Sequence, residues 1–404
     1  MSGAQYGNRR GEADRRVGSA PVTAIARAAA CLVLLASACT ATEAPPSEGP
    51  TGGPSRPGVV PCRFDHARPR RGEIPTAVDA LGTSDVWVVG ARYVGGTAVP
   101  FASNWNGQRW DTAPVEVIAD ANAGFHDVAL VGRELGWAVG WLRAEAPMVQ
   151  RWDGAAWTSV SLPVPGSVTE LFGVTAPSQD AMWAAGRVRD GRSYRPLVLR
   201  WDGAALQEQD VPSPAAANTT LRGIDAAGDG DAWAVGWTVA PGGRHRTLAM
   251  RLRDGAWRSV RTPNPGPGDH ILSSVAVLGR DDAWAVGWTI PQPDRERALL
   301  LRWDGRRWAT VPAPDIPGRS QLIDVAADGP DDVWAVGRAT DREEIFRSLV
   351  LHWDGTTWER IRPPRVRAGD NTLAGVALAH GSPWTVGTAV DHGGIYRSVI
   401  LNGC

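Results

Sequence analysis

The chain has 404 residues, of which 43% are hydrophobic and 21% charged, and this balance predicts a globular protein and excludes a disordered one. All 42 basic residues are Arg, which excludes the P-loop lysine of nucleotide-binding proteins, a Schiff-base lysine and a kinase-type lysine. The net charge of −1 lacks the positive excess that nucleic-acid binding usually needs.

The first 38 residues have the layout of a secretion signal. Several Arg between positions 9 and 16 precede an apolar run over 28–38, which as a helix would span about 16 Å, roughly half of a bilayer's hydrocarbon core. The run is too short for a permanent transmembrane helix, so we expect it to be removed on export. The pair Arg15-Arg16 leaves export by a twin-arginine route open.

A cysteine directly follows the apolar run. Residues 35–39 read Leu-Ala-Ser-Ala-Cys and resemble the lipobox of bacterial lipoproteins, which implies that Cys39 is lipidated and anchors the protein at the cell surface. The alternative is the Ala-x-Ala cleavage site over 36–38, which would release the protein into the medium. Residues 39–58, rich in Pro, Gly, Ser and Thr, are predicted to form a flexible tether.

Trp residues recur at a regular period through the rest of the chain. A Trp-x-Val-Gly-like motif begins at Trp87, Trp137, Trp183, Trp233, Trp284, Trp334 and Trp384, at spacings of 46 to 51 residues. A Val or Ile precedes six of these Trp by nine residues and the seventh by eight. Periods of this length are typical of repeat folds, so we predict seven structural units.

Each complete unit is predicted to contain four short strands. In the sixth unit they cover Leu322–Ala326, Val333–Val336, Ser348–Trp353 and Trp358–Ile361. A Trp-Asp-Gly-x-x-Trp motif or a variant of it joins the last two strands, and Asp-Gly favours a tight hairpin because both residues tolerate positive φ. No useful helical period is present. The chain is therefore predicted to be all-β, a seven-bladed β-propeller over 59–404 with four-stranded antiparallel blades and with Trp packed between them.

The repeat resembles those of bacterial secreted β-propellers and, more distantly, kelch, galactose-oxidase-type and Asp-box propellers. The resemblance covers residues 59–404 and implies the propeller architecture. It implies no activity, because the Gly pairs that begin at Gly95, Gly242 and Gly393 lie in predicted loops, whereas kelch blades carry theirs at the end of the second strand. The hairpins likewise read Asp-Gly-x-x-Trp where Asp-boxes have Asp-x-Gly-x-Thr-Trp.

The seventh unit stops before its fourth strand. Counting back from Val78 by the spacing of the other units predicts that Val59–Phe64 supplies the missing strand and closes the ring. This strand would bring Cys62 close to Cys404, and export would take both thiols to an oxidising compartment. We therefore predict a Cys62–Cys404 disulfide, and the alternative is two free thiols at the ends of the domain.

Signatures of catalytic and metal sites are not found in the sequence. There is no nucleophile, zinc-site or dinucleotide motif, and the seven His lack ligand spacing, so we expect neither a metal nor another cofactor. A metal site assembled from several blades would not be visible as a spacing. Residues 225–231 are similar to a calcium loop but lack the length and the final Glu of an EF-hand, and we predict a turn there.

A recurring Arg marks the candidate binding residues. Five consecutive units begin their third strand with Arg195, Arg246, Arg297, Arg347 and Arg397, and Tyr194 and Tyr396 precede the first and last of these. Loops on one rim of a propeller often bind ligands, and an Arg beside an aromatic ring suits a carboxylate, a phosphate or a sugar. The alternative is a shared packing role, such as an ion pair between blades. Trp141, Trp237 and Trp288 follow the Val-Gly of their motifs. They are predicted to form either a carbohydrate-stacking platform or packing between blades.

The sequence thus favours an exported, lipid-anchored propeller that acts at the cell surface as a non-catalytic binding or scaffolding module. Its expected partner is an extracellular protein or a glycan, its only membrane contact the lipid anchor, and its expected state a monomer. The alternative is a glycan-active enzyme, a sialidase-like hydrolase or a lyase, that uses Arg and Tyr on the loop rim.

Overall fold

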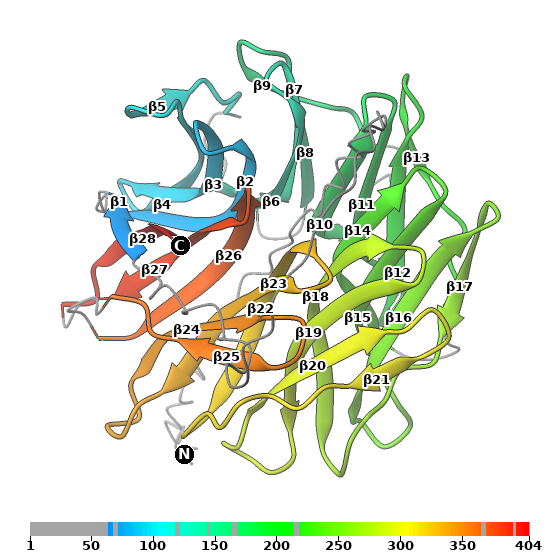
Figure 1. Ribbon diagram of the computed structural model, residues 1–404. Helices are drawn as coiled ribbons and strands as arrows, with labels where there is room; N and C mark the ends of the chain where they lie inside the picture. The colour runs from blue at the N-terminus through cyan, green and yellow to red at the C-terminus, as the bar shows by residue number, and fades with distance from the viewer. Residues whose placement is uncertain are drawn as a thin grey trace, which may run out of the picture.

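The computed structural model describes residues 64–67, 72–117, 122–143, 146–162, 169–213, 218–364, 369–390 and 393–403. Seven antiparallel sheets of four strands each follow one another around a ring, and each sheet is one blade (Figure 1). The first strand of each blade lies toward the middle of the ring and contacts the first strands of both neighbouring blades. This arrangement confirms the predicted seven-bladed propeller.

The blades are numbered from the N-terminus of the ring. Blade 1 comprises β2 (Glu73–Gly82), β3 (Asp85–Val94), β4 (Thr97–Trp105) and β5 (Trp110–Ala113). Blade 2 comprises β6 (Ala123–Gly132), β7 (Leu135–Leu142), β8 (Ala146–Trp152) and β9 (Trp157–Ser159). Blade 3 comprises β10 (Thr169–Ser178), β11 (Ala181–Asp190), β12 (Ser193–Trp201) and β13 (Leu206–Glu208). Blade 4 comprises β14 (Thr219–Gly228), β15 (Asp231–Val239), β16 (His245–Arg253) and β17 (Ala256–Val260). Blade 5 comprises β18 (Asp269–Gly279), β19 (Asp282–Ile290), β20 (Arg297–Trp303) and β21 (Trp308–Thr310). Blade 6 comprises β22 (Ser320–Gly329), β23 (Asp332–Thr340), β24 (Phe346–Trp353) and β25 (Trp358–Ile361). Blade 7 comprises β26 (Asn371–Ala379), β27 (Ser382–Val390), β28 (Tyr396–Gly403) and β1 (Phe64–Ala67).

The ring is closed by the first described strand of the chain. β1 pairs antiparallel with β28, with Phe64 opposite Gly403 and Ala67 opposite Ile400. An N-terminal strand therefore completes the last blade, as predicted, although it begins at Phe64, where the expected segment ended. Cys39, Cys62 and Cys404 lie outside the described residues, as do the expected signal and tether, so the lipid anchor and the disulfide stay predictions.

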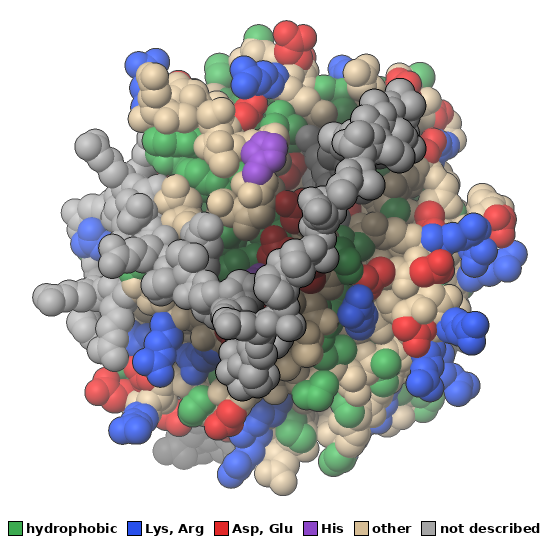
Figure 2. Space-filling model, in the orientation of Figure 1, with side chains coloured by type: hydrophobic (Ala, Val, Ile, Leu, Met, Phe, Trp, Pro, Cys, Tyr) green, Lys and Arg blue, Asp and Glu red, His purple; other side chains and the backbone are tan. Residues whose placement is uncertain are grey.

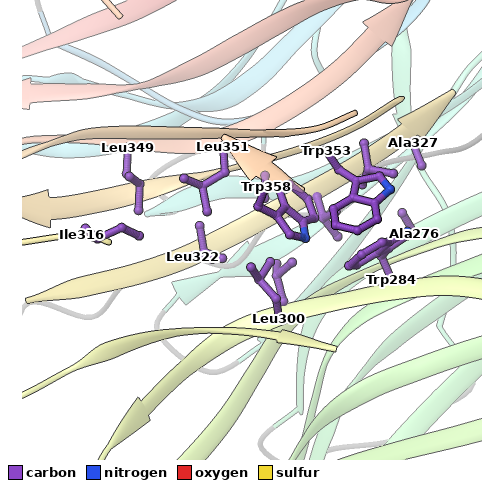
Figure 3. Packing of buried hydrophobic residues seen from close by; sticks show 14 of the residues in the cluster. Ala276, Trp284, Leu300, Ile316, Leu322, Ala327, Leu349, Leu351, Trp353 and Trp358 are labelled. Atoms are coloured by element: carbon purple, nitrogen blue, oxygen red, sulfur yellow. The ribbon is translucent and has the colours of Figure 1, made fainter. Parts of the chain in front are cut away.

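Tryptophan packing holds neighbouring blades together. Trp284 of blade 5 lies against Trp353 and Trp358 of blade 6, with ring centroids 5.0 and 5.2 Å apart (Figure 3). Its contact with Trp358 is nearly perpendicular, at an interplanar angle of 87°, a geometry that aromatic pairs favour. Trp233 of blade 4 contacts Trp303 and Trp308 of blade 5 in the same way, at 4.9 and 5.0 Å. The Trp repeat is therefore packing between blades, as the sequence predicted.

Buried aspartates form a second set of links near the middle of the ring. In four blades an Asp of the first strand accepts a backbone N–H from the next blade. The pairs are Asp79 with Leu130 (2.6 Å), Asp127 with Val174 (2.7 Å), Asp225 with Val277 (2.7 Å) and Asp324 with Val376 (2.9 Å). These carboxylates are at most 5% exposed, so their hydrogen bonds are shielded from water.

Two of these aspartates also reach back to the preceding blade. Asp225 accepts the Thr175 hydroxyl at 3.1 Å, and Asp324 accepts the Ser274 hydroxyl at 2.7 Å. Each of them therefore joins three consecutive blades. Asp225 itself lies within β14, and the turn predicted over 225–231 is formed by Asp229 and Gly230. The strand continues because the carboxylate is satisfied by donors from the two adjacent blades.

Candidate functional site: an arginine and aromatic cluster on blades 2 to 4

Every blade has a β-bulge at the same place in its first strand. In β10, Leu171 pairs with Gly186 and Gly173 pairs with Ala185, so Phe172 has no opposite residue in the ladder. The bulged residues of blades 1 to 7 are Thr76, His126, Phe172, Arg222, Ser273, Ile323 and Ala374. The first strands line the middle of the ring (Figure 1), so each blade has one residue outside its ladder there.

The glycine of the Trp-x-Val-Gly motif permits this bulge. A Cβ on Gly186 would overlap the carbonyl oxygen of Glu170, two residues before the bulged Phe172. The corresponding glycine of every other blade meets the same obstruction: Gly90, Gly140, Gly236, Gly287, Gly337 and Gly387. The repeated glycine thus has a structural role, and the residue at the bulge is what differs from blade to blade.

Small or aliphatic side chains occupy the bulge in four of the seven blades. The Thr76 hydroxyl donates to the Phe125 carbonyl of the next blade at 2.8 Å, and the Ser273 hydroxyl donates to the Leu322 carbonyl at 2.9 Å. Ile323 packs in a buried cluster, with Ala374 beside it. These four bulges therefore contribute packing and links between blades.

Blades 2, 3 and 4 carry larger side chains at the bulge, and these contact one another. The His126 ring stacks on Phe172 with centroids 5.5 Å apart, and its Nδ1 lies 2.9 Å from the Leu171 carbonyl oxygen. The Arg222 guanidinium lies over the Phe172 ring, 4.9 Å from its centroid. One histidine, one aromatic ring and one guanidinium from consecutive blades thus form a continuous stack.

The second and third strands extend this stack. Arg187 lies over the rings of Phe172 and Tyr194, at 5.7 and 4.1 Å, and forms a salt bridge with Glu170. Arg222 also lies 5.5 Å from the ring of Trp237. We call the set of His126, Glu170, Phe172, Arg187, Tyr194, Arg222 and Trp237 the arginine and aromatic cluster. Its members lie near the starts of first and third strands and near the ends of second strands, which is one end of the blades.

Burial determines the protonation of this cluster. It lowers the pKa of His126 to about 4, and the positive charge of Arg222 adds to this effect. His126 is therefore neutral near pH 7, with Nδ1–H donating to the Leu171 carbonyl and Nε2 left as an acceptor. Burial, followed by the charge of Arg187, lowers the pKa of Arg222 to about 10, so this side chain, which is 9% exposed, stays charged.

The residues predicted from the sequence do not converge on one site. Tyr194 belongs to the arginine and aromatic cluster, whereas Arg195 forms an ion pair with Glu208 at 2.5 Å on the outer strands of blade 3. A hollow of about 380 Å³ lies beside that ion pair. Tyr396 is 40% exposed and stacks on Tyr93 of blade 1 with centroids 6.4 Å apart.

The repeated Arg joins blades through backbone carbonyls. Arg246, Arg297 and Arg347 donate to the carbonyl oxygens of Gly268, Gly318 and Gly369 at 2.7, 2.6 and 3.1 Å. Each of these glycines directly precedes the first strand of the next blade or lies two residues before it. The contacts fit a shared packing role, in which the acceptors in the next blade are carbonyls and not the carboxylates expected of an ion pair between blades. Arg347 also pairs with Asp341 of its own blade at 2.7 Å. Arg397 has the same position at the start of β28.

Of the Trp residues that follow Val-Gly, only Trp237 belongs to the arginine and aromatic cluster. Trp288 is 9% exposed, while Trp141 is partly buried beside Gly124 of the paired strand. The three rings therefore do not form one exposed platform.

Sequence reasoning missed His126, Phe172, Arg222, Arg187 and Glu170. A signal for the first three was present, because each lies two residues before the Val or Ile that marks the repeat. Comparing that one position across the units would have separated blades 2 to 4 from the others. The contacts of Arg187 and Glu170 depend on strand pairing, which the period alone does not specify.

Two further findings concern the described residues. Among the residues that the structure describes, no three His, Cys, Asp or Glu side chains come together in a way that could hold a metal ion. No helix in the described ranges is long and apolar enough to cross a membrane. Charged side chains of both signs are spread around the face shown in Figure 2, in keeping with the near-zero net charge.

Comparison with known proteins gives likenesses of fold. No protein-family model matches the chain, and no curated protein does. A structure of YCF48 bound to D1 peptide aligns with a TM-score of 0.53 at 15% identity, covering 83% of this chain and 94% of that one. The fucose-specific lectin from Aleuria aurantia aligns at 0.43 and 11% identity, covering 70% and 93%. A Trypanosoma rangeli sialidase aligns at 0.44 and 13% identity, covering 68% and 52%. At these identities the likenesses show the propeller fold and nothing more specific.

Proposed function

We propose that this protein is a non-catalytic binding or scaffolding module that holds part of another extracellular macromolecule at the arginine and aromatic cluster. The observation that carries this proposal is the change of residue type at the bulge. Four blades use it for packing, whereas blades 2 to 4 fill it with His126, Phe172 and Arg222, which form one contiguous stack.

A departure from the repeat is informative because the repeated residues already account for the fold. The Trp stacks, the motif glycines and the Arg-to-carbonyl bonds recur from blade to blade and hold the ring together. The fold does not require a guanidinium at the bulge, since Ser, Thr, Ile and Ala serve there in other blades. Burying a guanidinium is costly, and the negative charge of Glu170 offsets part of that cost for Arg222.

A peptide segment is the partner type that the comparisons support best. The neighbour with a TM-score of 0.53 is a structure bound to a peptide, and a propeller of the same overall shape can present a comparable face. The glycan alternative keeps the same face and differs only in the ligand.

The proposed site of action is the cell surface. The apolar run over 28–38 and Cys39 support export followed by lipidation. Metabolic labelling with a tagged fatty acid tests this, because the label should enter the wild-type protein and be lost from a Cys39→Ala variant. Label retained by that variant would refute lipidation at this residue.

The glycan-active alternative relied on rim tyrosines. Tyr194 contacts Arg187 and Arg189 in blade 3, whereas Tyr396 contacts Tyr93 across the junction of blades 7 and 1. The described contacts thus give the two tyrosines separate surroundings. A panel of chromogenic glycosides tests the non-catalytic part of the proposal. Turnover of any of them that is abolished by Tyr194→Phe or Tyr396→Phe would overturn it.

Arrays of peptides and of glycans, probed with the purified exported protein, test the binding proposal itself. We expect saturable binding that is lost in Arg187→Ala and kept in Arg338→Ala. These two arginines hold the same strand position in blades 3 and 6, and each lies over an aromatic ring, at 4.1 and 4.2 Å, so they are a matched pair. Equal loss in both variants, or no saturable binding to any array, would refute the assignment of the site.

A further inference from the structure

Exposed apolar side chains gather at one place on the ring. Among the residues that the structure describes, five large hydrophobic side chains are exposed, and four of them are Tyr93 (50%), Val94 (58%), Ile395 (37%) and Tyr396 (40%). Tyr93 and Val94 end β3 of blade 1, whereas Ile395 precedes β28 of blade 7 and Tyr396 begins it. We call these four residues the junction patch, because they lie where the last blade meets the first.

The backbone holds the two halves of the junction patch together. The Gly72 N–H donates to the Tyr396 carbonyl at 3.1 Å, and the Tyr93 N–H donates to the Gly72 carbonyl at 3.0 Å. The two tyrosine rings are nearly parallel, with an interplanar angle of 20° and centroids 6.4 Å apart. The patch is therefore one surface that exists only when the ring is closed.

The junction patch stands on turns that project from the ring. A Cβ added to Gly95, Gly96 or Gly394 would meet no atom within 4 Å, and residues 92–97 are all exposed. Asp391 and His392, which belong to the blade 7 turn in sequence, lie outside the described residues. Small ligands are usually held in concave sites. A projecting apolar turn instead suits a broad, flat partner such as a bilayer.

We propose that the junction patch inserts into the interface of a lipid bilayer, as a second membrane contact beside the predicted lipid anchor; this inference rests on the cell-surface location in the proposed function. Read away from the turn, each half has an aliphatic residue, then a tyrosine, then an arginine. The two runs are Val94-Tyr93-Arg92 and Ile395-Tyr396-Arg397. Aliphatic side chains favour the hydrocarbon, tyrosines favour its boundary with the headgroups, and long arginine side chains reach the headgroups.

The place where the chain enters the ring is compatible with this contact. Cys39 precedes Phe64 by 25 residues, and a chain of that length can reach about 80 Å. Phe64 pairs with Gly403 at the far end of β28 from Tyr396, and the eight residues of β28 span about 27 Å. A lipid on Cys39 and the junction patch can therefore reach the same bilayer. Because the anchor raises the local concentration, even a weak insertion would orient the ring.

The size of the junction patch argues against a second copy of the chain as its partner. A fully covered tyrosine buries about 150–250 Å², so two that are about half exposed offer on the order of 200 Å². The two aliphatic side chains add less than this. A stable dimer buries about 800 Å² on each partner, so the patch alone is too small for one.

Co-sedimentation with phosphatidylcholine vesicles tests the proposal. The protein is the chain from residue 39, the form expected after export, with Cys39→Ala so that no lipid is attached. We expect a vesicle-bound fraction that rises with lipid concentration and changes little between about 50 and 500 mM NaCl, because salt does not screen apolar insertion. Val94→Asp should raise the lipid concentration at half-maximal binding about fivefold or more, because it places a carboxylate beside the turn.

Val117→Asp is the matched control. Val117 is 46% exposed and lies outside the junction patch, so this variant adds the same charge at a valine of similar exposure. We expect its half-maximal lipid concentration to equal that of the parent protein. Circular dichroism confirms that each variant is folded, and Tyr396→Ser, which should also weaken binding, replaces Val94→Asp if that protein is not.

Several results would overturn the inference. They are a parent protein that does not bind vesicles, binding that added salt abolishes, and equal weakening in the Val94→Asp and Val117→Asp proteins. Sedimentation equilibrium that finds a dimer in the parent and a monomer in Val94→Asp would assign the patch to a second copy instead. An array ligand that requires Tyr396, without any vesicle binding, would assign it to that ligand.

The vesicle assay is independent of the tests of the proposed function. It uses protein without lipid, so a failed labelling test at Cys39 is distinguishable from a patch that does not insert. Arg187→Ala should bind vesicles as the parent does, because Arg187 lies outside the junction patch. An array without saturable binding would therefore refute the macromolecule-binding function and leave the membrane contact standing.

Discussion

Replacing Asp225 by Ala removes an acceptor that ties blade 4 to both of its neighbours. The carboxylate accepts the Thr175 hydroxyl of blade 3 at 3.1 Å and the Val277 N–H of blade 5 at 2.7 Å. It also accepts the N–H of Ala226 at 2.8 Å. Asp225 is 0% exposed and Thr175 is 1% exposed, so water cannot replace the missing oxygens without the blades moving apart.

The size of the effect follows from these three bonds. A buried donor left without an acceptor costs about 1–3 kcal/mol, and three of them would cost about 3–9 kcal/mol. The variant no longer buries a carboxylate, which offsets part of this loss, so we expect a destabilisation of about 2–4 kcal/mol. Asp225→Asn keeps one oxygen, but its amide N–H₂ must face the N–H of either Val277 or Ala226. We expect it to lose about 1–2 kcal/mol.

Urea unfolding followed by tryptophan fluorescence measures this loss. The midpoint should fall in the order wild type, Asp225→Asn, Asp225→Ala, with the slope of free energy against urea unchanged. The control is Asp229→Ala, which removes an exposed partner of Arg200 at 3.0 Å and should cost less than about 1 kcal/mol. If Asp225→Ala unfolds at the same midpoint as Asp229→Ala, the buried carboxylate does not hold the blades together.

Three further predictions concern the backbone, the pH dependence and the thiols. Gly287→Ala should destabilise the protein by more than about 1 kcal/mol in urea unfolding, because the new Cβ overlaps a backbone carbonyl at the bulge. Burial raises the pKa of Asp324 to about 7, so the folded state holds a proton that the unfolded state loses, and the stability from this group falls as pH rises from about 4 to 7. The lowered pKa of His126, about 4, acts in the opposite sense, because the unfolded state takes up a proton below pH 6.5 that the folded state refuses. Unfolding free energies between pH 4.5 and 6.5 should therefore rise more steeply with pH in Asp324→Asn than in wild type, and less steeply in His126→Gln. Cys62 and Cys404 should resist alkylation in the native protein and react only after reduction.

Each of these has a matched control. Gly279→Ala places a Cβ in open space and should leave the urea midpoint nearly unchanged, so an equal loss would argue against the bulge explanation. Parallel pH profiles for wild type, Asp324→Asn and His126→Gln would contradict the assigned protonation states. Two alkylated thiols in the native protein would refute the disulfide.

Local chemistry explains why the sequence was sufficient for the architecture. A turn such as Asp354-Gly355 and the strand beside it are specified by adjacent residues, and Gly355 has the positive φ of 89° that this hairpin requires. The Trp period then sets the number of blades, because each unit must bury its Trp against the next. The closing strand was inferred from a count along the chain, but a count does not define the register that pairs Phe64 with Gly403.

The candidate site could not be read from the same local signals. His126, Phe172 and Arg222 are about 50 residues apart in sequence and meet because their blades are neighbours in a closed ring. The recurring Arg was the visible pattern, yet Arg246, Arg297 and Arg347 bind the backbone of the adjoining blade.

By itself, then, the sequence determined the all-β class, the seven units and the strand-by-strand plan, since turns and period are properties of short segments. The tertiary structure decided which side chains leave the ladder at the bulges, which aspartates link the blades, and where arginine and aromatic side chains meet. The physical reason is that these features depend on pairing register and on contacts between blades, which exist only once the ring has closed.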